Sequence, residues 1–238
     1  MDKKSILAID TSTVFGSVAV CQNKELVAQV QLGVKVTHSE RLLATIESVL
    51  QFADIDKHQL DAVAVASGPG SFTGLRIGLA TAKGLALGLD IPLYGISSLL
   101  TLAYNGLFAK DIVVSVIDAR RQEVYAAAYC FELAHKNEQV KSLLPEQTIS
   151  PKNLAEELKQ FSEPLLFMGD GAQVYEQEFK RILGEQAIFS SFDNRYPQAA
   201  NLASLAYEKL CTDEKDDLET LSPNYLRKSD AEIGFKGK

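Results

Sequence analysis

The sequence predicts an α/β protein made of two successive β-β-β-α-β-α units, and three observations lead to this fold class. Ser5 to Ile9 and Ile112 to Ile117 are short apolar segments of the kind that form buried strands. Each of them ends at an aspartate, Asp10 or Asp118. Each is followed by two more strand-like segments and then by alternating helices and short strands. The repetition of one order in both halves indicates an internal duplication.

The first unit has a well-defined helix start. Thr37 and Glu40 have the spacing of a capping box, and an apolar stripe at helical period, beginning at Leu42, follows them. The other elements of this unit are expected as strands over 16–21, 25–31, 62–66 and 91–94 and as a second helix over 74–88.

The second unit follows a connecting helix that is expected over residues 97–108. Ser150 and Pro151 predict another helix start, with the serine as cap and the proline in the first turn. The remaining elements are expected as strands over 123–131, 140–149, 165–168 and 187–189 and as helices over 151–161, 174–183 and 196–210. We expect the last helix to pack back toward the first half.

This order of elements matches the ribonuclease-H-like lobes of the actin, sugar kinase and Hsp70 (ASKHA) proteins. The predicted domains are an N-terminal lobe over residues 1–108 and a C-terminal lobe over 109–238 that includes the last helix and the tail. The fold class does not define the function, because these lobes carry several different chemistries.

The bulk composition excludes several functional classes. The formal net charge is -7 at pH 7, which argues against independent tight binding of nucleic acid. The three cysteines are far apart, so a disulfide framework or zinc knuckle is not expected. The sequence shows neither a signal peptide nor an apolar run that could span a bilayer. These features predict a soluble, cytoplasmic protein.

The turns after the first strand of each unit lie where actin-like ATPases hold phosphates. The first turn, Asp10 to Thr13, has hydroxyl groups but no glycine that would let a phosphate approach the backbone. The second turn, Asp118 to Arg121, places Arg120 where a phosphate would need room. A structural or degenerate pair of carboxylates is favoured over ATP hydrolysis, although carboxylates here can also hold a metal or orient water.

A glycine-rich loop and a glycine-rich helix follow the fourth strand. The loop, Ser67 to Gly74, lacks the lysine and the spacing of a P-loop, so a sharp structural connection is favoured over an anion site. Along the helix, Gly74, Gly78, Ala82 and Ala86 recur every four residues and therefore share one face. The pattern is equally compatible with close packing inside the lobe and with a helix–helix interface with another chain.

Histidine is too scarce to support a metal or a catalytic site. His38 lies in the first turn of a predicted helix, and the position four residues later, where a second ligand would be required, is Leu42. His58 and His135 have no ligand spacing. The sequence therefore predicts no metal ligands and no catalytic residues in this chain.

Several stretches, in order along nearly the whole chain, match one known family. They are ILAIDTST (6–13), HSERLL (38–43), SGPGSFTGLRIG (67–78), KGLA (83–86), SSL (97–99), DARRQEVY (118–125) and PNYLR (223–227). Through them the chain resembles the TsaB (YeaZ) family of tRNA threonylcarbamoyladenosine biosynthesis proteins, within the TsaB/TsaD (glycoprotease-like) family. The block over 67–78 is the most specific of these stretches.

The resemblance implies a non-catalytic partner subunit, needed for threonylcarbamoyl transfer to N6 of adenosine 37 in tRNA. It implies the paralogue TsaD and the ATPase TsaE as partners, a homodimer when alone, and contact with tRNA only through the complex. No cofactor is expected on this chain alone, but a nucleotide can lie at the joint with TsaD. The family interface maps onto His38, Arg41, Leu42, Leu43, Gly74, Leu75, Gly78 and Ala82.

Two enzyme functions remain as alternatives. A metallopeptidase of the glycoprotease type is suggested by the shared fold and by His38. An ATP-dependent kinase is suggested by the actin-like fold alone. The roles of Asp10, Asp118 and the acidic stretch 213–219 stay open.

Overall fold

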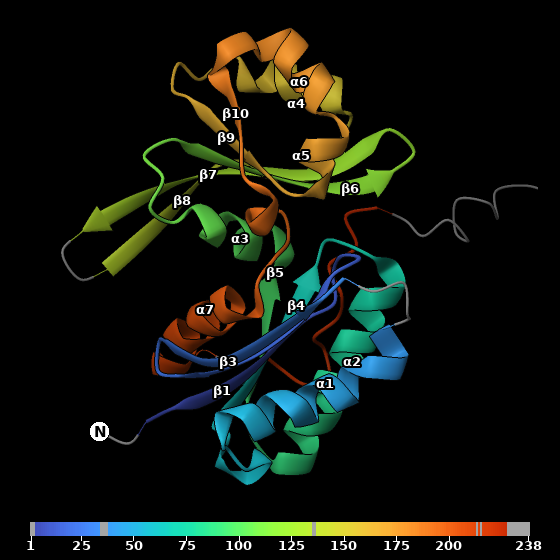
Figure 1. Ribbon diagram of the computed structural model, residues 1–238, viewed down its shortest axis with the longest axis vertical. Coiled ribbons are helices and arrows are strands. Elements are labelled where there is room, and N and C mark those ends of the chain that lie inside the picture. Colours follow the sequence, from blue (N-terminus) through green and yellow to red (C-terminus); the bar gives the residue numbers. More distant parts are fainter. Residues whose placement is uncertain (1–2, 34–37, 135–136, 213, 215, 228–238) are drawn as a thin grey trace, which may run out of the picture.

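The computed structural model describes residues 3–33, 38–134, 137–212, 214 and 216–227. Its core consists of two five-stranded sheets, one in each half of the chain. Figure 1 shows the two lobes stacked along the longest axis, with the first lobe below and the second above. The predicted α/β architecture of two ribonuclease-H-like lobes is confirmed.

The first sheet has the strand order β3-β2-β1-β4-β5. β1 pairs antiparallel with β2 and parallel with β4, and β2 pairs antiparallel with β3. The strands are β1 (Ser5–Asp10), β2 (Gly16–Gln22), β3 (Glu25–Leu32), β4 (Ala62–Gly68) and β5 (Leu93–Ser97). Every residue of β1 is buried, because helices cover both faces of this sheet.

The helices of the first lobe are α1 (His38–Ala53) and α2 (Phe72–Leu89), which pack side by side against one face of the first sheet (Figure 1). Thr37, the predicted cap of α1, lies outside the described residues. The cap of α2 is Ser71, whose hydroxyl accepts a hydrogen bond from the amide of Gly74.

The second sheet repeats the topology with the order β10-β9-β6-β7-β8. Its strands are β6 (Ile112–Arg120), β7 (Glu123–Ala134), β8 (Asn137–Ile149), β9 (Leu165–Met168) and β10 (Ala187–Phe189). One face is covered by α4 (Pro151–Leu158), α5 (Asp170–Val174) and α6 (Glu176–Leu183), and α3 (Ser98–Ala103) packs on the other. The predicted cap Ser150 and first-turn Pro151 are confirmed at the start of α4.

The helix predicted over 174–183 is present as α6, which begins at Glu176, but the short helix α5 before it was not predicted. The chain forms two short helices, α5 and α6, and they are separated at Tyr175, whose φ of -109° and ψ of 19° are not helical. The break lets α5 contact β6 while Phe179 of α6 packs its ring 4.5 Å from that of Phe167 on β9.

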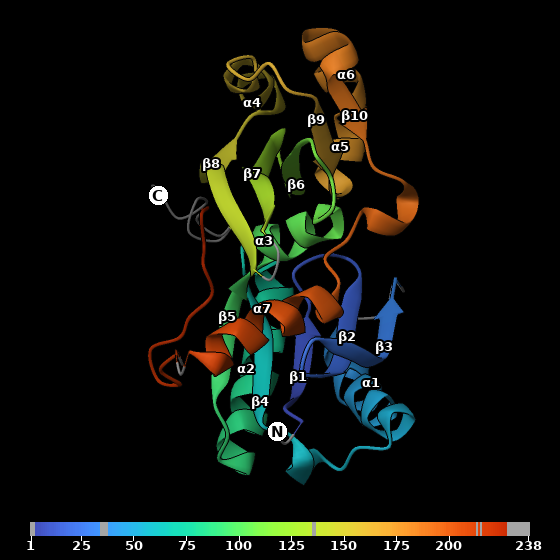
Figure 2. The same cartoon turned by 90° about the vertical axis from the view of Figure 1, so that its left-hand side faces the viewer.

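The last helix, α7 (Ala199–Cys211), packs on the first lobe, as was expected of it, although the predicted C-terminal lobe included this helix. It packs on the face of the first sheet opposite to α1 and α2 (Figure 2). Its first amides are satisfied by side chains of that sheet: the Ala199 amide donates to Ser17 Oγ at 3.1 Å and the Ala200 amide donates to Gln29 Oε1 at 2.9 Å. The predicted boundary between residues 108 and 109 falls between α3 and β6 and stays a prediction.

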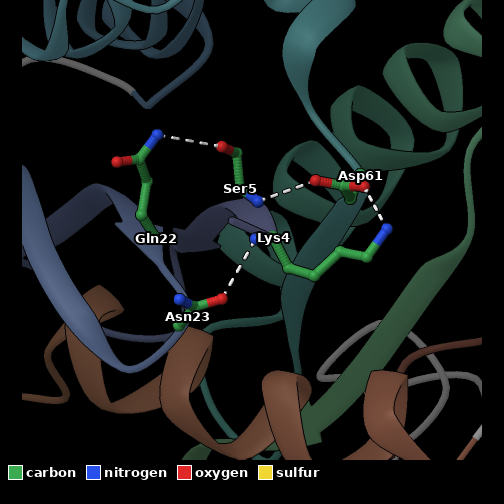
Figure 3. Close-up of polar contacts among 5 residues, drawn as sticks. All are labelled: Lys4, Ser5, Gln22, Asn23 and Asp61. Carbon is green, nitrogen blue, oxygen red and sulfur yellow. Dashed lines mark hydrogen bonds and ion pairs between the residues drawn. The ribbon is translucent and has the colours of Figure 1, made fainter. Parts of the chain in front are cut away.

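A polar cluster fixes the start of β1 (Figure 3). Asp61, just before β4, accepts hydrogen bonds from the Ser5 amide at 2.8 Å and from Lys4 Nζ at 2.7 Å. Asn23, in the β2–β3 turn, accepts from the Lys4 amide at 3.0 Å and donates its own amide to the Lys4 carbonyl at 2.7 Å. The cluster ties the first strand to both of its neighbours in the sheet.

We expect Asp61→Ala to lower the free energy of unfolding by about 1–2 kcal/mol, because it leaves the nearly buried Ser5 amide without this acceptor. Lys4→Ala is the matched control, since it removes the partly exposed ion pair, which is worth about 1 kcal/mol or less, and leaves Asp61 in place as the acceptor of the Ser5 amide. Urea denaturation of both variants measures the difference. Equal losses would show that the amide contact adds nothing beyond the ion pair.

No helix among the described residues is both long enough and apolar enough to cross a membrane.

Candidate functional site

A cleft of about 380 Å³ lies between the lobes, at the carboxyl ends of β1 and β6. The first lobe contributes residues 12–14 and 70–72, and the second contributes residues 117–120, Tyr125 and Asp170. The C-terminal segment adds Asn224, Tyr225 and Arg227. Both predicted phosphate turns therefore meet at one cleft, as the duplicated fold requires.

In the first turn, Asp10 points into the protein interior and is not among the residues that line the cleft. Its Oδ1 accepts hydrogen bonds from the amide and the hydroxyl of Ser12, at 2.9 and 2.8 Å. Its Oδ2 has no hydrogen-bond partner among the described residues. Burial raises the pKa of Asp10 to about 6, although the hydrogen bonds from Ser12 oppose this rise. As it lies here, this carboxylate is not placed to reach a ligand in the cleft.

The glycine-rich loop packs directly against the first turn. The Ser71 amide donates a hydrogen bond to the Ser12 carbonyl at 2.6 Å. A Cβ on Gly70 would lie 2.3 Å from the same carbonyl oxygen. The loop thus needs glycine for close backbone contact within the lobe, which supports the predicted structural connection rather than an anion site.

A pair of carboxylates lies at the second turn: Asp118 belongs to the turn, and Asp170 at the start of α5 lies beside it. Asp118 Oδ1 accepts a hydrogen bond from the Arg120 amide at 3.0 Å, and Asp170 Oδ1 accepts one from the Asp118 amide at 3.1 Å. The pKa of Asp170 is raised, mainly by burial and further by the negative charge of Asp118. Arg120 lines the cleft, as the sequence predicted, with its Nε 3.8 Å from Asp118 Oδ2.

Asp170 was not predicted as a cleft residue. The sequence signal that could have revealed it is Gly169-Asp170-Gly171, which directly follows the β9 strand. Gly169 has a φ of +113°, and a Cβ there would lie 1.9 Å from the Val116 carbonyl oxygen. These glycines allow α5 to begin against β6, and they bring Asp170 beside the second turn.

The part of the chain that the structure describes contains no group of three or more His, Cys, Asp or Glu side chains that could hold a metal ion. His38 is the first residue of α1, and its side chain lies outside the described part. The absence of a metal from this chain stays a prediction.

The small-residue face of α2 is not an open surface, which corrects its interpretation as a contact face for another chain. A Cβ on Gly74 would lie 2.0 Å from the Thr11 carbonyl oxygen, and one on Gly78 would lie 2.2 Å from Thr11 Oγ1. Thr11 also donates its hydroxyl to the Gly74 carbonyl at 2.7 Å. Leu75 and Ala82 are buried in the same lobe. The close packing of this face takes place inside the lobe.

Leu42 needs the same correction, since it is only 6% exposed and packs in the core beneath α1. Its neighbours Arg41 and Leu43 are exposed, and Leu43 is 60% accessible. Of the predicted interface residues whose side chains are described, only these two reach the surface. A partner in this region must therefore use the outer faces of α1 and α2.

The outer face of α2 combines small and apolar residues with one charged side chain. Thr73, Arg76, Ala80, Gly84 and Leu87 are exposed at three- and four-residue spacings, on the side of the helix opposite to the buried glycines. No atom lies within 4 Å of a Cβ built on Gly84 or on Gly88, and Leu87 is 75% exposed. Together with Leu43 on α1, these residues define the outer α1–α2 face.

Comparison with known proteins matches residues 27–235 to the family described as "TsaD: tRNA N6-adenosine threonylcarbamoyltransferase". The tRNA threonylcarbamoyladenosine biosynthesis protein TsaB of Bacillus subtilis (strain 168) is 35% identical over 228 residues, with 96% of each chain covered. TsaB of Escherichia coli (strain K12) is 31% identical, with 98% of this chain and 99% of that chain covered. The structure of YeaZ from Pseudomonas aeruginosa aligns with a TM-score of 0.79 at 28% identity, covering 94% of this chain and all of that one.

Proposed function

Since the chain belongs to the TsaB family of tRNA threonylcarbamoyladenosine biosynthesis proteins, we propose that it is the non-catalytic partner subunit in this modification of tRNA. The modification is the transfer of a threonylcarbamoyl group to N6 of adenosine 37. The chemistry belongs to a TsaD paralogue, and TsaE joins the pair. A nucleotide at the joint with TsaD is part of the same proposal.

The observation that carries the non-catalytic role is the close packing of the glycine-rich loop on the first turn. The Ser71 amide of this loop donates its hydrogen bond to the Ser12 carbonyl of the turn and not to a ligand. In addition, Leu42, at the position where the family resemblance places the second metal ligand of TsaD, lies in the core. Neither the peptidase nor the kinase alternative is favoured by any feature of the described residues.

We further propose that the partner binds the outer α1–α2 face. Leu43 and Leu87 are exposed apolar side chains on two adjacent helices, and a partner would cover them. The bare backbone at Gly84 and Gly88 lets a partner helix approach closely, and each exposed mid-helix glycine costs about 1 kcal/mol of helix stability. When TsaD is absent, the same face would join two copies of this chain. With a net charge of -7, the subunit contacts tRNA only through the complex.

We expect Gly84→Leu to weaken partner binding strongly without destabilising the fold. A leucine at this open position gains helix propensity of about 1 kcal/mol, so the melting temperature should stay equal or rise. At a packed helix contact, the added side chain should weaken affinity for purified TsaD by about 100-fold, or about 2.7 kcal/mol. Differential scanning calorimetry and isothermal titration calorimetry on the same preparation measure both effects.

Gln177→Leu is the matched control, because it adds an exposed leucine to α6 in the second lobe. This control should bind TsaD like the unchanged protein. If Gly84→Leu remains folded and its affinity for TsaD stays within about twofold, the outer α1–α2 face is not the interface.

A further inference from the structure

The C-terminal segment 216–227 runs along the first lobe and ends on the second. In Figure 2 it is the dark red chain that leaves the region of α7 and extends toward the upper lobe. At its beginning, Asp216 Oδ2 accepts a hydrogen bond from the Gly95 amide at 2.8 Å. Leu218 and Leu221 then pack against the core beneath α1 and α2. These contacts anchor the segment to the first lobe.

The middle of the segment holds the start of α2. The Asn224 amide donates a hydrogen bond to the Ser67 carbonyl, at the end of β4, at 2.7 Å. The ring of Tyr225 stacks on Phe72 with a centroid distance of 4.3 Å, and its hydroxyl accepts from Arg76 Nε at 3.0 Å. The carbon of the Arg76 guanidinium lies 4.0 Å from the centroid of the Phe72 ring and 5.9 Å from that of the Tyr225 ring.

The end of the segment crosses to the second lobe. Arg227 Nη1 donates a hydrogen bond to the Ala119 carbonyl, and its Nε lies 3.5 Å from Glu123 Oε2. The side chain of Arg227 is only 12% exposed, so both contacts form in partial shelter from water. Ala119 and Glu123 flank the tip of the β6–β7 hairpin, and Arg227 therefore bridges both sides of it.

This hairpin tip is a strained part of the protein. Arg120, Arg121 and Gln122 have φ values of 65°, 54° and 61°, in the left-handed region that non-glycine residues rarely adopt. Such a conformation persists only where surrounding contacts hold it in place. Arg227 supplies such a contact from a distant part of the sequence.

We propose that residues 216–227 act as a strap that fastens the strained β6–β7 hairpin of the second lobe to the start of α2 in the first. The strap closes one side of the cleft with the protein's own residues, since Asn224, Tyr225 and Arg227 line it. It also connects the helix that bears the outer α1–α2 face to the second phosphate turn. This inference does not depend on the identity of the partner.

The test is hydrogen–deuterium exchange of the full-length Arg227→Ala protein, followed by mass spectrometry. Loss of the Arg227 contacts should raise amide exchange in residues 118–125 and 220–227 by about tenfold or more, which corresponds to about 1.4 kcal/mol of local opening. Exchange in β1–β3 and α1 should remain unchanged. Arg181→Ala, which removes an exposed arginine paired at 3.7 Å with Glu178 on α6, is the matched control and should change neither region.

Glu123→Gln tests the same contact from its other partner. It weakens the ion pair with Arg227 and keeps the hydrogen bond to Ala119, so amide exchange in the same two regions should rise by a smaller factor. If the Arg227→Ala protein does not fold, this variant decides the question. Unchanged exchange at 118–125, or a uniform rise over both lobes, would show that the segment is not a strap.

Discussion

We expect Gly74→Ala to lower the free energy of unfolding by about 2 kcal/mol. A methyl group there would lie 2.0 Å from the backbone carbonyl oxygen of Thr11, which is fixed at the end of a fully buried strand. Neither backbone can move aside without displacing α2 from the first sheet. Overpacking of this kind costs about 1–3 kcal/mol and sometimes more, and it outweighs the gain of about 1 kcal/mol that alanine brings to a helix.

Gly84→Ala in the same helix is the matched control. Its Cβ meets no atom within 4 Å, so helix propensity alone should act, and stability should rise by up to about 1 kcal/mol. Denaturant unfolding of both variants gives changes of opposite sign. If Gly74→Ala proves as stable as Gly84→Ala, the packing of α2 on Thr11 is looser than the distances indicate.

This contrast shows what the sequence could and could not predict about α2. The four-residue spacing of Gly74, Gly78 and Ala82 correctly placed them on one face. Small residues suit any close neighbour, however, and the neighbour is Thr11, which is more than 60 residues away in the sequence. The spacing alone could not distinguish a contact within the lobe from one with another chain.

Local patterns predicted the order of elements, because the spacing of apolar residues differs between strands and helices. Capping residues, in addition, mark where a helix begins. The Ser150-Pro151 start of α4 and the strands β9 and β10 were located from a few residues each. The short helix α5 was missed, because its position depends on how α5 and α6 pack on the second sheet.

The candidate site was predictable only in part, for a related reason. Asp10, the last residue of β1, and Asp118, two residues before the end of β6, identified the segments that meet at the cleft, since equivalent strands of a duplicated fold end near equivalent places. Contacts between distant segments, such as Arg227 with Ala119, span 108 residues and leave no local pattern. They depend on the way in which the C-terminal segment folds back over both lobes.

The buried carboxyl group of Asp10 should make the free energy of unfolding depend on pH. Burial raises its pKa to about 6 in the folded protein, whereas the ordinary value of about 3.8 applies to the unfolded chain. Between these values the folded state binds more protons than the unfolded state, so the free energy of unfolding falls as pH rises. Asp10 therefore disfavours folding above about pH 6 by roughly 3 kcal/mol, relative to pH below 4.

We expect Asp10→Asn to be more stable than the unchanged protein at pH 8, by about 1–2 kcal/mol. The amide is neutral at every pH and fits the same space, so the cost of burying a charge disappears. Part of that gain is lost because Oδ2 has no hydrogen-bond partner among the described residues, and an amide nitrogen placed there would lack an acceptor. At pH 4 the carboxyl is itself protonated, so the advantage of the variant should vanish or reverse.

Urea unfolding of the two proteins at several values between pH 4 and 8 measures this difference. Asp170 and Glu146, whose pKa values are also raised by burial, titrate in both proteins, so their contributions cancel when the two curves are subtracted. The difference should grow with pH mainly between about 4 and 6 and then stay level. A difference that is independent of pH would show that Asp10 has an ordinary pKa and that its second oxygen is hydrated in solution.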